Sequence, residues 1–313
     1  MQSKPKIDKN FDSAFVRYPD AIRNRYLLVM LHEITWGNLN GDPDQNNRPR
    51  TDTSTGNSIT SSVSTKSHIR CEAGIIKGNT TGFKMYIESG EILNKKDGEA
   101  LLAVCGSADA AEQKAYMKKH PDKTRDPLAF MCKNYWDIRT FGGVMTKFSQ
   151  NKEGVRANVC GPVQVSTGVS VSPVNVVDLS ITRKCVATEE EAQSTFGDQY
   201  AIPYGLYVTT INIDPVFALR DTGFNQEDLN LLLDSITHLY EHDKSTARTD
   251  AYVRRLFEFK HDSIYGNAPN YELLQRIQIR PKVEPDQVRK FEDYEVSVDL
   301  TDMPEGVSFR QIL

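Results

Sequence analysis

The chain has 313 residues, of which 39% are hydrophobic and 26% are charged, and its formal net charge is -4. This length can bury a sizeable core, either in one large domain or in two small ones. Because the chain is acidic overall, it is not expected to bind nucleic acid over its whole surface. Any phosphate-binding face must therefore be local.

The cysteines are far apart and form no CxxC pair; they are Cys71, Cys105, Cys132, Cys160 and Cys185. This spacing argues against a cysteine zinc site and favours reduced thiols in a cytosol. No apolar run approaches the roughly 20 residues that cross a membrane. The first residues also lack the apolar core of a signal peptide. We expect a soluble, cytoplasmic protein with no membrane partner.

The first predicted element is a strand over 25–34, whose nearly continuous apolar character is typical of a central strand covered on both faces. A polar stretch, 35–56, follows it. Loops of this length inside compact domains are usually functional or disordered. A helix is expected over 58–73, with Val63 and Ile69 facing inward.

The segment 74–133 shows no steady strand period and is expected to be a mainly helical insertion. A strand, or a strand edge broken by Gly142 and Gly143, is predicted over 136–148. Valines that alternate with small polar residues over 161–184 then predict β structure.

The last predicted elements are an extended hairpin or arm over 185–203, a strand over 204–214, a helix over 225–243 and a closing strand over 251–262. The order is strand, helix, inserted strands, strand, helix, strand. This order predicts an α+β fold with a ferredoxin-like or RRM-like core that carries large insertions. With no internal repeat and no long linker, one elaborated domain is the simplest interpretation.

Short motifs for metal or nucleotide chemistry are incomplete. His238 and His242 lie one helical turn apart, as in zinc hydrolases, but Leu239 stands where those enzymes have Glu. The sequence "GNTTGFK" over 78–84 has three residues between its glycines and lacks the hydroxyl of a phosphate-binding loop. We expect two ordinary histidines and no nucleotide hydrolysis.

The polar stretch also contains Asp42, Asp44 and Asp52. Carboxylates in a flexible loop suit Mg²⁺, a hard cation. Asn, Gly, Asp and Pro are equally the residues of ordinary tight turns. We favour turns over a metal site.

Basic residues fall near the predicted strand ends and loops; they are Arg48, Arg50, Lys66, His68, Arg70, Arg139, Arg183, Lys184, Arg248, Arg254, Arg255, Lys260 and His261. Aromatic residues lie between them in the sequence: Phe141, Tyr204, Tyr207 and Phe257. Guanidinium groups pair with phosphates, and aromatic faces stack on bases. On an RRM-like sheet this combination predicts an RNA platform, although there is no RNP1-like run.

Several segments share their wording and order with a known family: "WGNLNGDPDQNNRPRTDTSTG", "DIRTFGGVM", "GPVQVSTGVSVSPV", "ITRKCVA", "IPYGLYV" and "YEHDKSTARTDAYVRRLFEFKHDSIYGNAP". Together they resemble the Cas-seven family of CRISPR-associated proteins. The resemblance is strongest to the backbone subunit of type I-C Cascade complexes, and it covers roughly 24–274.

The resemblance implies an RRM-like palm over about 24–75 and 134–275, a finger over 76–133 and a thumb hairpin over 181–203. The acidic segment 284–313 follows. Copies would stack along one CRISPR RNA, hold its backbone and leave its bases free to pair with target DNA. Other Cascade subunits and a recruited helicase-nuclease would be partners. The resemblance therefore implies a subunit without catalytic residues, metal or cofactor.

The resemblance also implies where the RNA would lie. The polar loop would be ordered only by guide RNA or by an adjacent subunit. The first helix would face phosphates, and small residues after Arg139 would allow close approach of the backbone. The full set of expected RNA contacts is Asn40, Arg48, Arg50, Lys66, His68, Arg70, Arg139, Thr140, Phe141, Gly142, Gln164, Ser166, Arg183, Lys184, Arg248, Arg254, Lys260 and His261.

Two alternatives remain from the sequence. The first is a metal-dependent ribonuclease of the type III kind that uses Asp42 or Asp44 together with His32. The second is a structural protein that oligomerises without nucleic acid.

Overall fold

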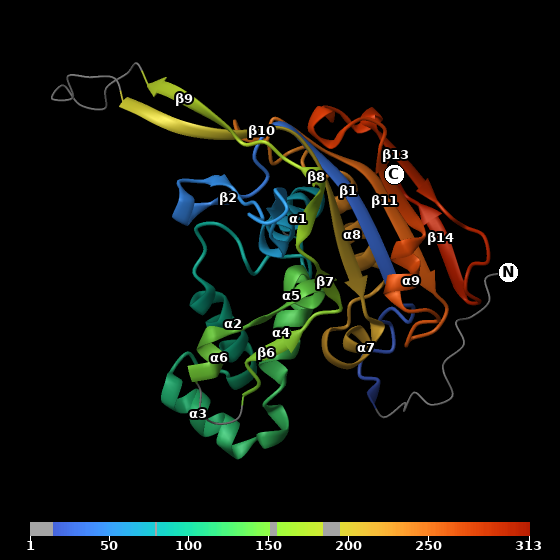
Figure 1. The fold of residues 1–313 in the computed structure, drawn as a ribbon. Coiled ribbons are helices and arrows are strands. Elements are labelled where there is room, and N and C mark those ends of the chain that lie inside the picture. The colour runs from blue at the N-terminus through green and yellow to red at the C-terminus, as the bar shows by residue number, and fades with distance from the viewer. Residues whose placement is uncertain (1–14, 79, 151–154, 184–194) are drawn as a thin grey trace.

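A computed structural model describes residues 15–78, 80–150, 155–183 and 195–313. Figure 1 shows a twisted sheet, a hairpin that projects from it and a helical lobe beside it. The strands are Tyr26–Gly37 (β1), Gly41–Asp42 (β2), Arg48–Pro49 (β3), Asn57–Thr60 (β4), Gly142–Val144 (β5), Asn158–Cys160 (β6), Val163–Val165 (β7), Gly168–Pro173 (β8), Val177–Arg183 (β9), Thr195–Ile213 (β10), Asp250–His261 (β11), Ile277–Pro281 (β12), Tyr294–Val298 (β13) and Val307–Gln311 (β14). The helices are Ser62–Lys77 (α1), Leu93–Cys105 (α2), Ala110–Lys119 (α3), Asp126–Asn134 (α4), Trp136–Phe141 (α5), Thr146–Gln150 (α6), Pro215–Phe217 (α7), the π-helical turn Ala218–Thr222 (η4), Gln226–Thr237 (α8) and Asn270–Gln275 (α9).

The main sheet has the strand order β14-β11-β1-β10-β8-β4, and neighbouring strands are antiparallel. The first strand, β1, lies between β10 and β11, and Leu28 is paired with Ile211 on one side and Glu258 on the other. Its first nine residues are all buried. The predicted central strand over 25–34 is therefore confirmed.

The core elements follow in the order β1, α1, β8, β10, α8, β11, which is two interleaved β-α-β halves. Helices α1 and α8 contribute to the same hydrophobic cluster and contact each other. The fold is therefore a mixture of helices and antiparallel sheet, as the α+β prediction requires.

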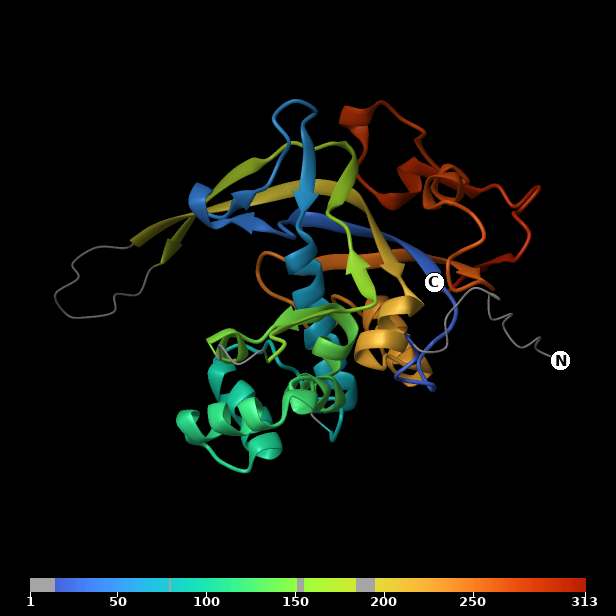
Figure 2. The same ribbon diagram turned by 90° about the horizontal axis from the view of Figure 1, so that it is seen from below.

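Side chains alternate between the two faces of β1, and both faces are covered. Leu28 and Met30 belong to the cluster that contains helix residues such as Leu232. Leu27 and Val29 instead share a cluster with residues of the C-terminal segment. Figure 2 shows the helices on one side of the sheet and the C-terminal segment on the other. The sheet consequently has no open face over its central strands.

The helical lobe contains α2, α3, α4 and α6 and has a hydrophobic cluster of its own. Leu101, Met117, Met131 and Phe148 lie at its centre, each at most 1% exposed. The helical character predicted for 74–133 is confirmed.

The predicted helix over 58–73 begins later and ends later than expected. Residues Asn57–Thr60 form β4, and Ser61 caps α1 by accepting a hydrogen bond from the backbone N–H of Ser64. Ile69 is buried as predicted, but Val63 is 73% exposed. The hydroxyl-rich stretch can cap a helix at several positions, so pairing with β8 decides the boundary.

The strand predicted over 136–148 was wrong. This segment forms α5, the short strand β5 and α6. Gly142 ends α5 with φ +74°, and a Cβ there would lie 2.3 Å from the carbonyl oxygen of Val159. A short apolar run does not distinguish a buried helix from a strand.

The projecting hairpin consists of β9 and the first part of β10, which pair from Val177 with Ala201 to Arg183 with Thr195. The same strand β10 continues into the main sheet and ends at Ile213. The predicted arm over 185–203 is therefore present in its described part. Residues 184–194 lie outside the described residues.

The predicted helix over 225–243 is present as α8 but ends at Thr237. Asn225 and Asp228 form a capping box at its N-terminus. Within the described ranges, no helix combines the length and apolar character that crossing a membrane requires.

Candidate nucleic-acid interface

The polar loop after β1 is folded by its own hydrogen bonds. The Asn38 side-chain amide donates to the carbonyl oxygen of Asn47 at 2.8 Å, and the Asn40 side-chain oxygen accepts from the Ser61 N–H at 2.8 Å. Asp52 accepts from the N–H of Ser54 at 2.9 Å. The expectation that only RNA or a neighbour orders this loop was wrong, because turn residues satisfy the backbone internally. Asn40 positions the start of α1.

Arg48 joins the polar loop to the hairpin. Its guanidinium lies 3.3 Å from the Asp178 carboxylate on β9 and 5.2 Å from the centroid of the Tyr200 ring on β10. The Asn46 side chain also donates to Asp198 at 3.4 Å. The ion pair is accessible, with the Arg48 side chain 42% exposed and that of Asp178 67% exposed. Arg48 therefore holds a cation at the surface where loop and hairpin meet.

Arg50 lies on the same loop and faces Asp42. The two side chains are 3.4 Å apart, and the arginine side chain is 39% exposed. Asp42 also caps the short turn after β2 by accepting from the Asp44 N–H at 3.2 Å. The Asp42 carboxylate thus acts in an ordinary turn and an ion pair, as the simpler sequence interpretation expected.

Lys66 and Arg70 lie on successive turns of α1, with the ring of Phe141 beneath them. The ammonium group of Lys66 is 5.6 Å from the ring centroid, and the guanidinium of Arg70 is 5.1 Å from it. Burial, followed by the nearby charge of Arg70, lowers the pKa of Lys66. Arg70 donates to Asp137 at 2.9 Å and is only 11% exposed. Arg70 is thus held by a carboxylate, whereas no ion pair joins Lys66 to a carboxylate of the described residues.

His68 does not lie on an exposed turn, which corrects the sequence expectation. It is 6% exposed, one ring nitrogen contacts the Asp243 carboxylate, and its ring meets the edge of Tyr240. Burial lowers the pKa of His68, although Asp243 acts in the opposite direction. The side chain is built into the core beneath α1 and cannot reach a phosphate.

Arg139 is also internal rather than part of an open track. It is 8% exposed, and its guanidinium donates to both carboxylate oxygens of Asp228, at 2.8 and 2.6 Å. It also donates to the carbonyl oxygens of Cys132 and Gly82, at 2.7 and 3.0 Å. Its donors are used inside the protein, so this predicted RNA contact becomes a structural group.

Most of the other residues expected to line the RNA backbone are buried as well. Thr140 is fully buried, Phe141 is 6% exposed and Gly142 is buried. Gln164 is exposed and donates to the carbonyl oxygen of Gly161 at 2.9 Å. Ser166 is half-buried, and its hydroxyl accepts from the Thr210 N–H at 3.0 Å. Gln164 is the accessible member of this group.

The basic residues on β11 point to different places. Arg254 is 3.3 Å from Glu33 and 2.9 Å from Glu292, and the ammonium of Lys260 lies 5.8 Å from the Tyr26 ring centroid. His261 is fully buried, and burial lowers its pKa to about 4. These side chains do not form one phosphate-binding row, because β11 is an inner strand covered by β14 and the C-terminal segment.

Arg248 follows α8 and lies 3.4 Å from Asp243. Its Nε is buried and has no partner among the described residues. Arg183 is the last residue of β9, and Lys184 lies outside the described residues.

The predicted aromatic platform was wrong. Tyr204, Tyr207 and Phe257 are at most 7% exposed, and the sheet faces that carry them are covered on both sides. The exposure of these rings was predicted only from their positions on strands. The sequence did not indicate that the C-terminal segment would cover one face of the sheet. No base can stack on these rings in this fold.

His238 and His242 follow the end of α8 and have separate partners. The backbone carbonyl oxygen of Asp234 is 2.8 Å from a ring nitrogen of His238, and the Glu72 carboxylate is 2.9 Å from His242. Across the described residues there is no group of three or more His, Cys, Asp or Glu side chains placed to hold a metal ion.

The sequence matches the model of a known family, CRISPR-associated protein Cas7, over residues 24–299. This chain belongs to the Cas7 family. Two solved structures are similar to it. One is described as "CRISPR RNA-guided surveillance complex, pre-nicking", with 13% identity, coverage of 75% of this chain and 78% of that chain, and a TM-score of 0.46. The other, "CRISPR RNA-guided surveillance complex", has 14% identity, coverage of 74% and 68%, and a TM-score of 0.38. No curated protein matches the sequence.

Trp36 is a surface feature of this Cas7-family chain that sequence reasoning did not assign. It lies at the end of β1, is 58% exposed and has φ +46°. A bulky residue in this backbone region costs of order 1–3 kcal/mol and is found mostly at functional sites. The sequence signal that could have identified this site is a tryptophan at the end of a core strand, directly before a polar loop. Trp36 stands at the end of the strand that leads into the loop carrying Arg48.

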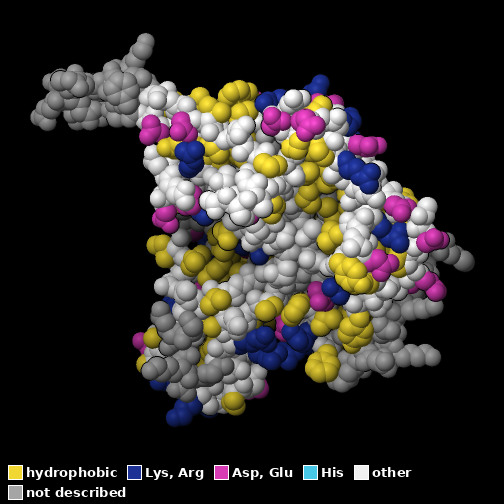
Figure 3. Space-filling view, viewed as in Figure 1, with side chains coloured by type: hydrophobic (Ala, Val, Ile, Leu, Met, Phe, Trp, Pro, Cys, Tyr) yellow, Lys and Arg dark blue, Asp and Glu magenta, His cyan; other side chains and the backbone are white. Residues whose placement is uncertain are grey.

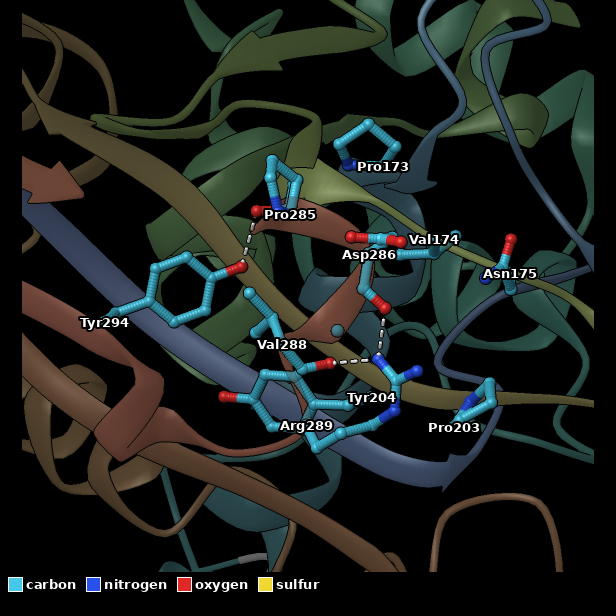
Figure 4. Close-up of a pocket in the computed structure, with 12 residues that line it drawn as sticks. Pro173, Val174, Asn175, Pro203, Tyr204, Pro285, Asp286, Val288, Arg289 and Tyr294 are labelled. Atoms are coloured by element: carbon cyan, nitrogen blue, oxygen red, sulfur yellow. Dashed lines mark hydrogen bonds between the residues drawn. The ribbon is translucent and has the colours of Figure 1, made fainter. Parts of the chain in front are cut away.

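Figure 4 shows a small cavity between the sheet and the C-terminal segment of this Cas7-family chain. Its volume is about 40 Å³, and Pro173, Pro203, Tyr204, Pro285 and Tyr294 are among its lining residues. The cavity has room for a few water molecules at most. It is a packing defect beneath the C-terminal segment rather than a ligand site.

Proposed function

We propose that the chain is a non-catalytic, guide-RNA-binding backbone subunit of a CRISPR surveillance complex of the type I-C Cascade kind. Copies would assemble along one CRISPR RNA in the cytoplasm and present its bases for pairing with target DNA. The observation that carries this proposal is the Cas7 family match over residues 24–299. Other Cascade subunits and a recruited helicase-nuclease would complete the machinery.

The parts of the fold suit this role. We interpret the sheet with α1 and α8 as an RRM-like palm, the helical lobe as a finger and the β9–β10 hairpin as a thumb. The hairpin projects away from the sheet, so it can reach a neighbouring copy (Figure 1). This interpretation assigns assembly to the hairpin and RNA contact to the surface near its base.

The loop–hairpin surface, defined here as Trp36, Arg48, Arg50 and Lys66, is the site we propose for the guide backbone. The Arg48–Asp178 pair is exposed, and exposed ion pairs contribute only about 0–1 kcal/mol. Exchanging the carboxylate for a phosphate therefore costs little. A guanidinium can bind a phosphate through two hydrogen bonds, and such contacts carry no base preference.

Two observations favour this proposal over a metal-dependent ribonuclease. His32 is fully buried, and its ring nitrogens lie 2.9 Å from the Tyr240 hydroxyl and 3.0 Å from the Thr209 hydroxyl. Asp42 is engaged by Arg50 and by the turn it caps. A histidine with both nitrogens occupied in the core cannot serve as a base toward RNA on the surface.

The test is to express the full chain with a CRISPR RNA, purify it and measure both the RNA bound and the mass in solution. We expect recovered guide RNA and assemblies of several copies. Arg48→Gln combined with Lys66→Gln should weaken binding of every RNA sequence alike. The salt dependence should fall by about 0.7 per lost phosphate contact on a single strand.

The matched control is Arg280→Gln combined with Lys282→Gln, which removes the same charge from an exposed part of the C-terminal segment. This control should bind RNA as the parent does. A parent protein that remains monomeric and free of RNA at low ionic strength would contradict the proposal. Recovery of assemblies after nuclease treatment, without RNA, would favour a purely structural protein instead.

A further inference from the structure

Four arginines from four distant parts of the chain line one hollow. Arg17 precedes β1, Arg125 precedes α4, Arg156 precedes β6 and Arg220 lies in η4. Together with Phe15 and Asp221 they line a space of about 420 Å³. Figure 3 shows Lys and Arg side chains gathered in the lower part of the view, between the helical lobe and the end of the sheet. We call this feature the arginine hollow.

Asp221, the one carboxylate among the lining residues of the arginine hollow, forms ion pairs with two of the four arginines. Asp221 lies 3.4 Å from Arg156, and Arg220 donates to it twice, at 2.8 and 2.6 Å. No ion pair joins Arg17 or Arg125 to a carboxylate of the described residues. The hollow thus places four positive charges against one negative charge.

The backbone holds these like charges together. The N–H groups of Arg17 and Tyr18 both donate to the carbonyl oxygen of Leu219, at 3.0 and 3.1 Å, and the Arg156 N–H donates to Thr124 at 3.3 Å. Partial burial, and then the charges of Arg17 and Arg156, lower the pKa of Arg125. Like charges held near one another repel, so an anion bound there would relieve a cost already present in the fold.

The arginine hollow is far from Arg48 of the loop–hairpin surface. Tyr200 on β10 contacts Arg48, and η4 comes after the last residue of that strand, Ile213, and the short helix α7. The 13 residue steps between Tyr200 and Ile213 span about 40 Å at the usual rise of a strand. One nucleotide cannot touch both places, so the hollow would be a second contact.

We propose that the arginine hollow binds a backbone phosphate of a nucleic-acid strand, at a site separate from the loop–hairpin surface. Arg17 and Arg125 would supply the free guanidinium groups, while Arg156 and Arg220 are held in place by Asp221. Arginine suits this task because its planar fork matches phosphate geometry. The inference rests on the proposed function, since the strand would be either the guide RNA or a DNA strand brought to the assembly.

The experiment compares Arg17→Gln with Arg125→Gln in one chain against the control Arg280→Gln with Lys282→Gln. One arm measures the guide RNA retained per chain after co-expression and purification. The other arm titrates guide-loaded protein with a labelled 30-nucleotide single-stranded DNA unrelated to the guide, at several salt concentrations. In the hollow variant only, we expect either the retained guide RNA or the DNA affinity at low salt to fall about tenfold. If DNA binding is the one that falls, its salt slope should decrease by about 0.7 for the one lost phosphate contact.

The two arms identify the source of the phosphate. Loss of DNA binding with the guide retained assigns the site to DNA, and loss of retained guide assigns it to RNA; either supports the inference. Equal behaviour of the hollow and control variants in both arms overturns it. It is also overturned if the hollow variant changes only the mass of nuclease-treated protein, because a protein segment would then occupy the site.

A charge-preserving variant separates binding from folding. Arg17→Lys with Arg125→Lys keeps both charges, so its salt slope should remain at the parent value. A slope that falls as far as in the glutamine variant would indicate a structural effect and contradict the inference. Failure of the proposed function is distinct, since a parent protein that neither retains RNA nor assembles can still be titrated with the DNA in its guide-free form and compared with the hollow variant.

Discussion

Arg139 illustrates how the partner of a side chain, rather than its type, decides its role. Arg139→Ala should destabilise the protein by about 3–5 kcal/mol, because it leaves the Asp228 carboxylate buried without its partner. Urea unfolding followed by circular dichroism measures this loss. Arg70→Ala, whose partner Asp137 lies on the helix of Arg139, provides a comparison, since Asp137 would keep the backbone N–H groups of Tyr86 and Ile87 as donors, whereas Asp228 would keep that of Asn225. An Arg139→Ala protein of parental stability that loses RNA binding would restore the original prediction of a phosphate contact.

His32 should make stability depend on pH. Burial, and then the nearby His68, lower the pKa of His32 to about 3, whereas the unfolded chain binds that proton near pH 6.5. The unfolded state therefore holds more protons between these values, so stability is complete above about pH 6.5 and decreases as the pH falls. His32 alone should remove about 2 kcal/mol at pH 5.

Unfolding curves at pH 7.5 and pH 5 test this expectation. His32→Gln, although less stable at neutral pH, should lose less stability between these two values than the parent. Equal losses in parent and variant would show that His32 does not control the acid sensitivity. The buried His261 should contribute in the same direction, because its pKa is lowered to about 4.

The positions of basic residues are visible in the sequence, but their partners are not. Arg139 and Asp228 are 89 residues apart, and His68 and Asp243 are 175 apart. Only the folded chain brings such pairs together. Arg48 was predicted as a contact and remains accessible, because its carboxylate partner is itself at the surface.

At the scale of elements, long periodic segments were predictable and short apolar ones were not. The continuous apolar run of β1 and the leucine spacing of α8 each indicated one element type. The segment 136–148 contains too few turns for a period to appear, and its structure is set by the close packing of Gly142 against β6. Tertiary contacts decide such cases.

The projecting hairpin provides the prediction at this scale. Removing residues 180–198 and joining Leu179 to Gln199 through an Asn-Gly turn should leave the fold intact, since these two residues face each other in the ladder. The thermal midpoint should change by only a few degrees. If the hairpin links neighbouring copies, the shortened protein should no longer form long assemblies on RNA in light scattering. Assemblies of parental length would remove the hairpin from the assembly model.

The whole molecule differs from a simple RRM-like sheet because its C-terminal segment covers one face. Val288 and Tyr294 pack in the cluster that contains Leu27 and Phe257, and β14 extends the sheet beside β11. The sequence showed this segment only as an acidic stretch. Its role depends on which strands it packs against, and no local sequence pattern indicates them.

Ending the chain after Gln275 should therefore expose the apolar face of the central strands. We expect strong binding of a hydrophobic dye, aggregation and a much lower thermal midpoint, because these strands lose their cover. Tyr294→Phe, which keeps the ring and removes only the hydrogen bond to Ser172, is the mild control. A shortened protein that stays folded and binds RNA more tightly would show that the covered face is the RNA platform after all.

The uninterrupted course of β10 has a mechanical consequence. Because this one strand begins in the hairpin and ends at Ile213 in the main sheet, a pull on the hairpin acts along the strand axis rather than peeling it from one end. Its hydrogen bonds to β1 would then have to yield together, in shear. A load between adjoining copies would thus be borne by the ladder between β10 and β1 and carried to the far end of the sheet.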